Sequence, residues 1–276
     1  MNQNTLEIQA AIQGVRSAAR QLDLPFNEYP AQPDTMPTPA KADIIAATQA
    51  ALTAGKDPGT DKNIIGLITR HYLAMHIGIA TVQTNNYEQD KLAHEVAEAT
   101  RLLTAARPII EESQQHLTAA KDGGIVVSNI ESGFTGTAQQ VLLHAQASIA
   151  NARLKAATEL IWWAARAQGH NLQYLSGNIA CLTLADLTLA QHHGLGLGRK
   201  GDADPWLLVS NGVTLNFASD AEEVRRRWTA IHEAEEALHA RILAAMPHAH
   251  NMPAGKYGEA FNLAVEGKLT YRGQRV

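Results

Sequence analysis

Apolar residues recur three or four positions apart along much of this chain, which is the spacing of one face of an α-helix. The longest stretch with this pattern runs from Thr137 to His170, contains no proline, and has no glycine before Gly169. Its apolar seam is narrow and consists of Leu142, Ala145, Ile149, Ala152, Ala156 and Trp163. The pattern predicts a long central helix whose small residues let a second helix approach closely.

Two earlier stretches repeat this spacing over several helical turns. The first carries Ile65, Ile68, Tyr72, Met75, Ile79 and Val82, and the second carries Leu92, Val96, Ala99, Leu103 and Ala106. Asp61 is placed to cap the first of these helices, and Thr84–Asn86 is expected to separate it from the second. Pro108 is expected to start a further turn of helix. Antiparallel helices with short connections are typical of a bundle.

A proline-rich segment follows a first predicted helix over Thr5–Leu22. Leu24–Ala40 contains five prolines, Pro33 and Pro37 among them, and this composition forbids a helix and favours an extended chain. The segment is interpreted either as a linker or as an arm that lies across a neighbouring subunit. The predicted organisation is an N-terminal helix at 1–22, the arm or linker at 23–40, and a helical domain at 41–276, with a further division near 124 as an alternative.

Late in the chain, the helical spacing gives way to two short strand-like runs. Trp206–Ser210 and Val213–Phe217 flank the pair Asn211-Gly212. Asn-Gly between two such runs predicts a β-hairpin at about 206–217, because a type I′ turn needs two residues that tolerate positive φ. The expected fold class is therefore mainly α: a multi-helix bundle with a long central helix and a small β-hairpin insertion.

Composition supports a helical protein without a general attraction to polyanions. Aromatic residues make up 5% of the chain, which is low for a β-sandwich core. A net charge of −4 gives no signal for nucleic acid or for an anionic membrane. The one cysteine, Cys181, cannot form an internal disulfide and suits a reducing compartment. The chain shows no signal peptide and no apolar run of roughly 20 residues, so a cytoplasmic location is expected.

Glu236 and His239 form the strongest candidate for chemistry, a Glu-x-x-His pair. This spacing places a carboxylate and an imidazole on one helix face, as carboxylate-bridged di-iron bundles require. Glu235 and His232 stand nearby, but the second Glu-x-x-His copy is missing, so a solvated acidic face is the favoured interpretation. No cofactor is expected under this interpretation, and a divalent metal or iron belongs only to the alternative.

Several apolar seams and the lack of a complete catalytic constellation favour a non-enzymatic structural or assembly protein. We expect it to form a homo-oligomer or to dock in a larger particle, such as a phage head or neck. The expected contact residues are one of Trp162 and Trp163 as an aromatic anchor, together with Pro33, Pro37, Trp206, Asn211 and Gly212. The alternatives are a helical-bundle metalloprotein or oxidoreductase that uses Glu236 and His239, and a regulatory module that binds one protein partner.

Overall fold

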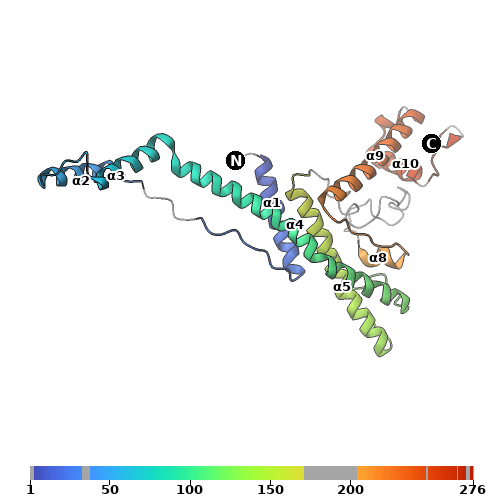
Figure 1. Ribbon diagram of the computed structural model, residues 1–276. Helices are drawn as coiled ribbons and strands as arrows, with labels where there is room; N and C mark the ends of the chain where they lie inside the picture. The colour runs from blue at the N-terminus through green and yellow to red at the C-terminus, as the bar shows by residue number, and fades with distance from the viewer. Residues whose placement is uncertain are drawn as a thin grey trace. The chain divides into compact units, whose positions relative to one another are not determined.

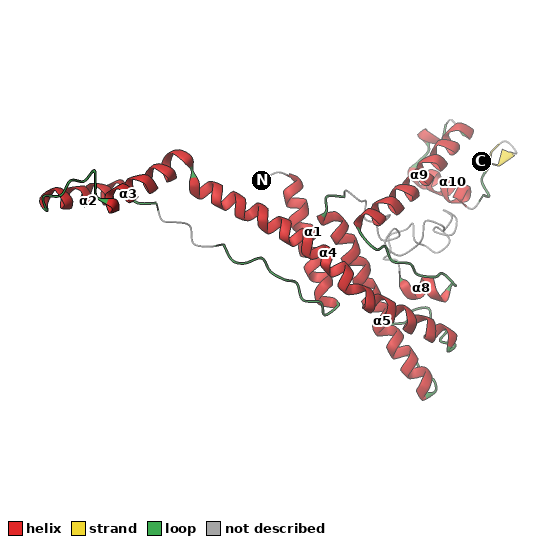
Figure 2. Cartoon of the chain, viewed as in Figure 1, coloured by secondary structure: helices red, strands yellow, loops and turns green. Residues whose placement is uncertain are grey.

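The computed structural model describes residues 3–32, 38–170, 204–246, 248–265, 267–271 and 274–275. This part of the chain is mainly helical, which confirms the predicted α class (Figure 2). No helix within it combines the length and the apolar character that a membrane span requires. Pro33, Pro37 and Cys181 lie outside the described residues.

The chain divides into two compact units, and Figure 1 labels their helices. Unit 1 comprises Met1–Asn27 and Val96–Val276, and unit 2 comprises Glu28–Glu95. The elements of unit 2 are α2 (Lys41–Thr53), α3 (Lys62–Tyr72), the π-helix η1 (Leu73–Ile77) and the beginning of α4 (Ile79–Asp122). The boundary between the units falls inside α4.

Unit 1 contains the rest of α4 and most of the other helices. These are α1 (Gln3–Gln21), α5 (Ala138–Ala167), α8 (Pro205–Ser210), α9 (Ala221–Ala245), the 3₁₀-helix η2 (Ala249–Asn251) and α10 (Ala254–Val265). Two short strands, β1 (Thr270–Tyr271) and β2 (Gln274–Arg275), pair in antiparallel fashion after α10.

The main core of unit 1 forms where α1 and α4 pack with α5. Val15 and Ala18 of α1, Leu102 of α4, and Leu154 and Ile161 of α5 are all buried in one hydrophobic cluster. Many of their neighbours are alanines, whose small side chains let helix axes come close together. The predicted helix–helix packing through small residues is therefore present within one chain.

The central helix α5 has the predicted limits but a different buried face. Thr137 caps it, and its hydroxyl and the side chain of Gln140 form a reciprocal capping box. The predicted seam is wrong in its first half, since Leu142 is 58% exposed and Ile149 is 59% exposed. The buried stripe instead runs through His144, Ala147, Asn151 and Leu154. Alanines on several sides make two stripes comparably apolar, and the partner helices determine which one is buried.

The predicted β-hairpin at 206–217 is wrong. Trp206–Ser210 lies in the helix α8, whose first turn carries Pro205 and whose N-cap Asp204 accepts a hydrogen bond from the backbone N–H of Trp206 at 2.9 Å. Asn211 caps the C-terminus, and Gly212 follows with φ of 85°. Asn-Gly tolerates positive φ in either context, so the pair ends a helix here rather than forming a type I′ turn.

The break between the two predicted seam helices lies earlier than expected. Asp61 caps α3 as predicted and accepts a hydrogen bond from the N–H of Asn63 at 2.8 Å. The interruption comes at Gly78, which has φ of 64° directly after the π-turn of η1. Thr84–Asn86 and Pro108 both lie inside α4. Low helix propensity at Thr84–Asn86 is thus overridden, whereas a left-handed glycine interrupts the helix.

Candidate interaction surface

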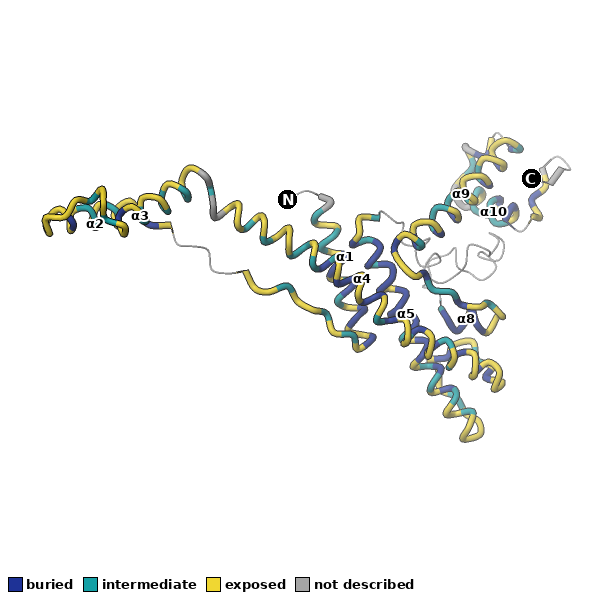
Figure 3. Tube along the Cα trace, viewed as in Figure 1, coloured by how far each residue is buried: buried dark blue, intermediate teal, exposed yellow. Residues whose placement is uncertain are grey.

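Unit 2 has very little buried interior. Among its described residues only Pro39, Ala51, Ile64 and Glu95 are buried, and Figure 3 shows α2 and α3 as mostly exposed or intermediate. None of the hydrophobic clusters formed by the described residues includes a member of unit 2. The apolar side chains of this unit must therefore lie mainly at its surface.

Four of these exposed side chains form a continuous row, which we call the α3 stripe. It consists of Ile65, Ile68, Tyr72 and Met75, whose exposed fractions are 45%, 50%, 56% and 65%. The first three lie on α3 and Met75 lies in η1. Spacings of three and four place Ile65, Ile68 and Tyr72 on one face of α3, and Met75 follows them in the π-helix. The sequence pattern identifies this row as a seam, and the structure leaves it exposed.

The other helix of unit 2 covers a different part of α3. α2 packs against α3, and the residues that the two helices bury are Ala51 and Ile64. Ile45 and Leu52 of α2 are themselves exposed, at 48% and 61%. α2 therefore does not supply the apolar surface that would bury the α3 stripe.

Asp61 and Lys62 lie at the N-terminal end of the α3 stripe, and its other edge positions carry no fixed charge. Thr69, His71 and His76 occupy the positions that flank it in a heptad scheme. His71 has its Nδ1 at 2.8 Å from the carbonyl oxygen of Pro39, and the ring of His76 lies 4.7 Å from that of Tyr72. Arg70 lies on the opposite face, and its Nε donates to the carbonyl oxygen of Gly66 at 3.2 Å. The surface is thus apolar, with polar edges and two charged residues at its N-terminal end.

The described start of the proline-rich segment lies against a helix of its own unit. The hydroxyl of Tyr87 donates to the carbonyl oxygen of Pro30 at 2.8 Å, and the amide of Gln32 donates to the hydroxyl of Thr84 at 3.3 Å. The ring of Tyr29 lies 5.4 Å from that of Tyr87. These contacts hold residues 29–32 along the first turns of α4.

Aromatic residues predicted as interface anchors make their observed contacts within the chain. Trp162 is 1% exposed in the core of unit 1. Trp163 packs on α1 at Gly14, where an added Cβ would collide with its ring. Trp206 is buried, and its indole N–H donates to the carbonyl oxygen of Val127 at 2.9 Å. Asn211 is exposed at the end of α8, with Gly212 beside it.

A buried asparagine that the sequence pattern does not single out holds α8 against α5. The side-chain oxygen of Asn151 accepts the backbone N–H of Trp206 at 2.9 Å. Beside it, Lys155 Nζ lies 2.6 Å from a carboxylate oxygen of Glu131 and 3.4 Å from one of Asp204. The hydrogen bond from Lys155 lowers the pKa of Glu131. These groups form hydrogen bonds and ion pairs with one another, so the cluster has a structural role and holds α8 against α5.

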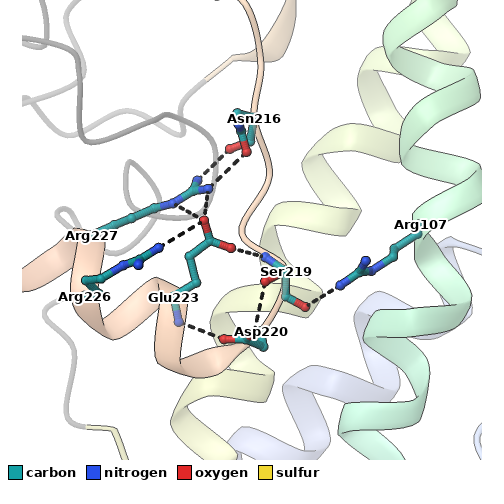
Figure 4. Close-up of polar contacts among 7 residues, drawn as sticks. All are labelled: Arg107, Asn216, Ser219, Asp220, Glu223, Arg226 and Arg227. Atoms are coloured by element: carbon teal, nitrogen blue, oxygen red, sulfur yellow. Dashed lines mark hydrogen bonds and ion pairs between the residues drawn. The ribbon is translucent and has the colours of Figure 1, made fainter.

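A second polar cluster fixes the start of α9 (Figure 4). Glu223 accepts hydrogen bonds from the backbone N–H of Ser219 at 2.7 Å and from Arg227 Nε at 3.1 Å. Burial raises the pKa of Glu223, but the bonds from Ser219 and Arg227 outweigh it and bring the pKa to about 2. Arg227 also donates to the carbonyl oxygen of Asn216 at 2.6 Å. Arg107 of α4 donates to the carbonyl oxygen of Ser219 at 3.3 Å. The cluster ties α9 to α4.

A shallow cavity adjoins this cluster on the side of α4. Leu103, Arg107, Ile110, Ile161, Leu215 and Phe217 are among the residues that line it. Arg107 is its main cationic group and already donates to the backbone at Ser219. Its lining is mixed, since the polar residues Glu111, Gln114, Asn216 and Ser219 stand beside the apolar side chains.

Glu236 and His239, the two main residues of the candidate metal site, contact different side chains. Glu236 lies 3.3 Å from Nε2 of His232, one helical turn away, while Nδ1 of His239 lies 2.6 Å from the hydroxyl of Tyr257. The ring of His239 also stacks on Phe261, with centroids 4.4 Å apart. No group of three or more His, Cys, Asp or Glu side chains suited to a metal ion occurs among the residues described. Glu235 is half-buried on the same helix.

Comparisons with family models, with curated proteins and with solved structures returned no match to this chain.

Proposed function

We propose that this chain is a non-enzymatic structural protein that self-associates, and that unit 2 is the part that becomes covered on assembly. The observation that carries the proposal is the poor burial of unit 2. Several of its large apolar residues are between 45% and 65% exposed, namely Ile45, Leu52, Ile65, Ile68, Tyr72, Met75 and Val82. Contiguous apolar surface of this kind marks contact sites in soluble proteins.

Energetics support the same conclusion. Moving a large apolar side chain from water into a fully packed site contributes about 1.5–3 kcal/mol. Unit 2 lacks most of this stabilisation by apolar burial, because its described residues belong to no hydrophobic cluster. An assembly would supply the missing contacts, and the ordering of α2 and α3 would then be coupled to association.

Mass measurement tests the proposal on the full chain. The monomer mass is 29.8 kDa. Sedimentation equilibrium across the micromolar range should give a weight-average mass that rises with concentration towards a multiple of this value. A mass that stays at 29.8 kDa over the whole range would overturn the proposal.

A further inference from the structure

We infer that Asn211 is a site of spontaneous deamidation, and that the C-terminal end of α8 determines how fast the reaction proceeds. Asn211 is the one asparagine of the chain that is followed by glycine. Asn211 and Gly212 are both exposed. The site lies in unit 1, so the inference goes beyond the proposed self-association and does not depend on it.

Deamidation of this pair needs no enzyme and no cofactor, only water. The backbone nitrogen of Gly212 loses its proton and attacks Cγ of Asn211, and the new C–N bond closes a succinimide ring. The bond from Cγ to Nδ2 then breaks, and Nδ2 leaves as ammonia with the proton from Gly212. Water opens the ring at either carbonyl and leaves aspartate or isoaspartate at position 211. Glycine favours the attack because it has no Cβ to hinder the approach.

The folded backbone holds the attacking nitrogen away from its target. Asn211 has ψ of 10°, which turns the nitrogen of Gly212 towards the backbone nitrogen of Asn211 and away from its Cβ. The N–H of Gly212 also donates to the carbonyl oxygen of Val209 at 3.0 Å. The N–H of Val213 donates to the carbonyl oxygen of Leu208 at 3.0 Å, which completes a Schellman motif. The ring therefore cannot close until ψ of Asn211 rotates and the motif opens.

The leaving group is held by the same end of α8. Nδ2 of Asn211 donates to the carbonyl oxygen of Leu207 at 2.8 Å, and the backbone N–H of Asn211 donates to the same oxygen at 3.2 Å. Rotation of the carboxamide towards Gly212 breaks the bond from Nδ2. The reaction is thus coupled to opening of the last turn of α8, as hydrogen exchange of a protected amide is coupled to local unfolding.

Conversion of Asn211 favours the open state of this helix end. Both products replace the amide by a carboxylate, which cannot donate to Leu207 and which the negative end of the helix dipole disfavours. Isoaspartate also adds its Cβ to the main chain and so changes the spacing of the Schellman bonds. The residues that follow lie against α4, where Nε2 of Gln114 donates to the carbonyl oxygen of Leu215 at 3.0 Å. Deamidation therefore weakens the attachment of residues 212–215 to α4.

Peptide mapping by mass spectrometry tests whether the fold slows the reaction. The full chain is incubated at neutral pH, once folded in buffer and once unfolded in guanidinium chloride, and the products at position 211 are measured over time. We expect conversion to be at least about tenfold faster in the unfolded chain, because the closed helix end protects the folded one. Equal rates in the two conditions would overturn the inference.

Two matched variants separate opening of α8 from general destabilisation. Asp204→Ala removes an N-cap acceptor of α8, and Asp220→Ala removes the N-cap acceptor of α9. Circular dichroism verifies that both variants fold. In the folded state we expect Asp204→Ala to speed conversion of Asn211 about threefold or more and Asp220→Ala to speed it less than about twofold. No acceleration in Asp204→Ala, or equal acceleration in the two variants, would overturn the inference.

Discussion

Individual residues show how closely the helices of unit 1 are fitted. Gly14 of α1 faces the ring of Trp163 so tightly that no Cβ fits between them. Trp163 is also covered by Arg166, whose guanidinium lies 5.4 Å from the ring centroid. The sequence indicates that one of the two adjacent tryptophans closes a core. It does not show that the second packs on α1, because the partner of a helix face is set by tertiary structure.

Gly14→Ala should destabilise unit 1 by about 1–3 kcal/mol, because the added methyl group forces α1 away from Trp163. Chemical denaturation monitored by tryptophan fluorescence measures the change. Gly258→Ala in α10 is the matched control, since a Cβ there meets nothing within 4 Å. It should stabilise the helix by about 0.5–1 kcal/mol. Equal destabilisation by both changes would contradict the close approach at Gly14.

A second prediction at this scale concerns the acid stability of unit 1. Hydrogen bonds from Arg101 and Asn27 lower the pKa of Glu98 and outweigh the opposing effect of burial. The pKa of Glu98 therefore reaches about 2, against an ordinary value of 4.5. A carboxylate with a depressed folded-state pKa stabilises the protein above pH 4.5, and this contribution is lost as the pH falls from about 4.5 to 2.

The Glu98→Gln variant should therefore lose on the order of 2 kcal/mol of stability at pH 7. Its stability should also fall less steeply than that of the wild type between pH 4.5 and 2. Urea denaturation at a series of pH values measures both effects. Glu235→Gln on α9 is the control. Parallel pH profiles for Glu98→Gln and the wild type would show that this carboxylate does not contribute as described.

Whole elements were predictable where local signals were consistent. The predicted cap Asp61 correctly places the start of α3, and the long apolar spacing from Thr137 correctly places that of α5. The hairpin was not predictable in this way, because a strand-like run such as Trp206–Ser210 forms a helix once Asp204 and Pro205 start it. The α3 stripe is visible in sequence as a seam, but its exposure depends on which faces the neighbouring helices cover.

The position of α8 depends on Asn151. Asn151→Ala should cost about 1–3 kcal/mol, because it leaves the buried backbone N–H of Trp206 with only Asp204 as an acceptor. The measurement is thermal or chemical denaturation of the full chain. Asn211→Ala, at the exposed end of α8, removes one local hydrogen bond to Leu207 and should cost less. A smaller loss of stability in Asn151→Ala than in Asn211→Ala would contradict the role of Asn151 in holding α8 in place.

At the scale of the molecule, the two units differ in how they are held together. Unit 1 buries long, contiguous clusters along α1, α4 and α5. Unit 2 places comparable apolar residues on α2 and α3 but leaves them at the surface. This contrast is the observation that supports the proposed self-association through unit 2. It could not be read from the sequence, because buried and exposed seams have the same spacing.

Hydrogen exchange measured at two protein concentrations tests the central claim most directly. If unit 2 is completed by association, backbone amides of 62–77 should exchange much more slowly at high than at low concentration. Amides in the core of α5, such as those near Leu154, should be protected equally at both concentrations. Protection of 62–77 that does not change with concentration would contradict the account.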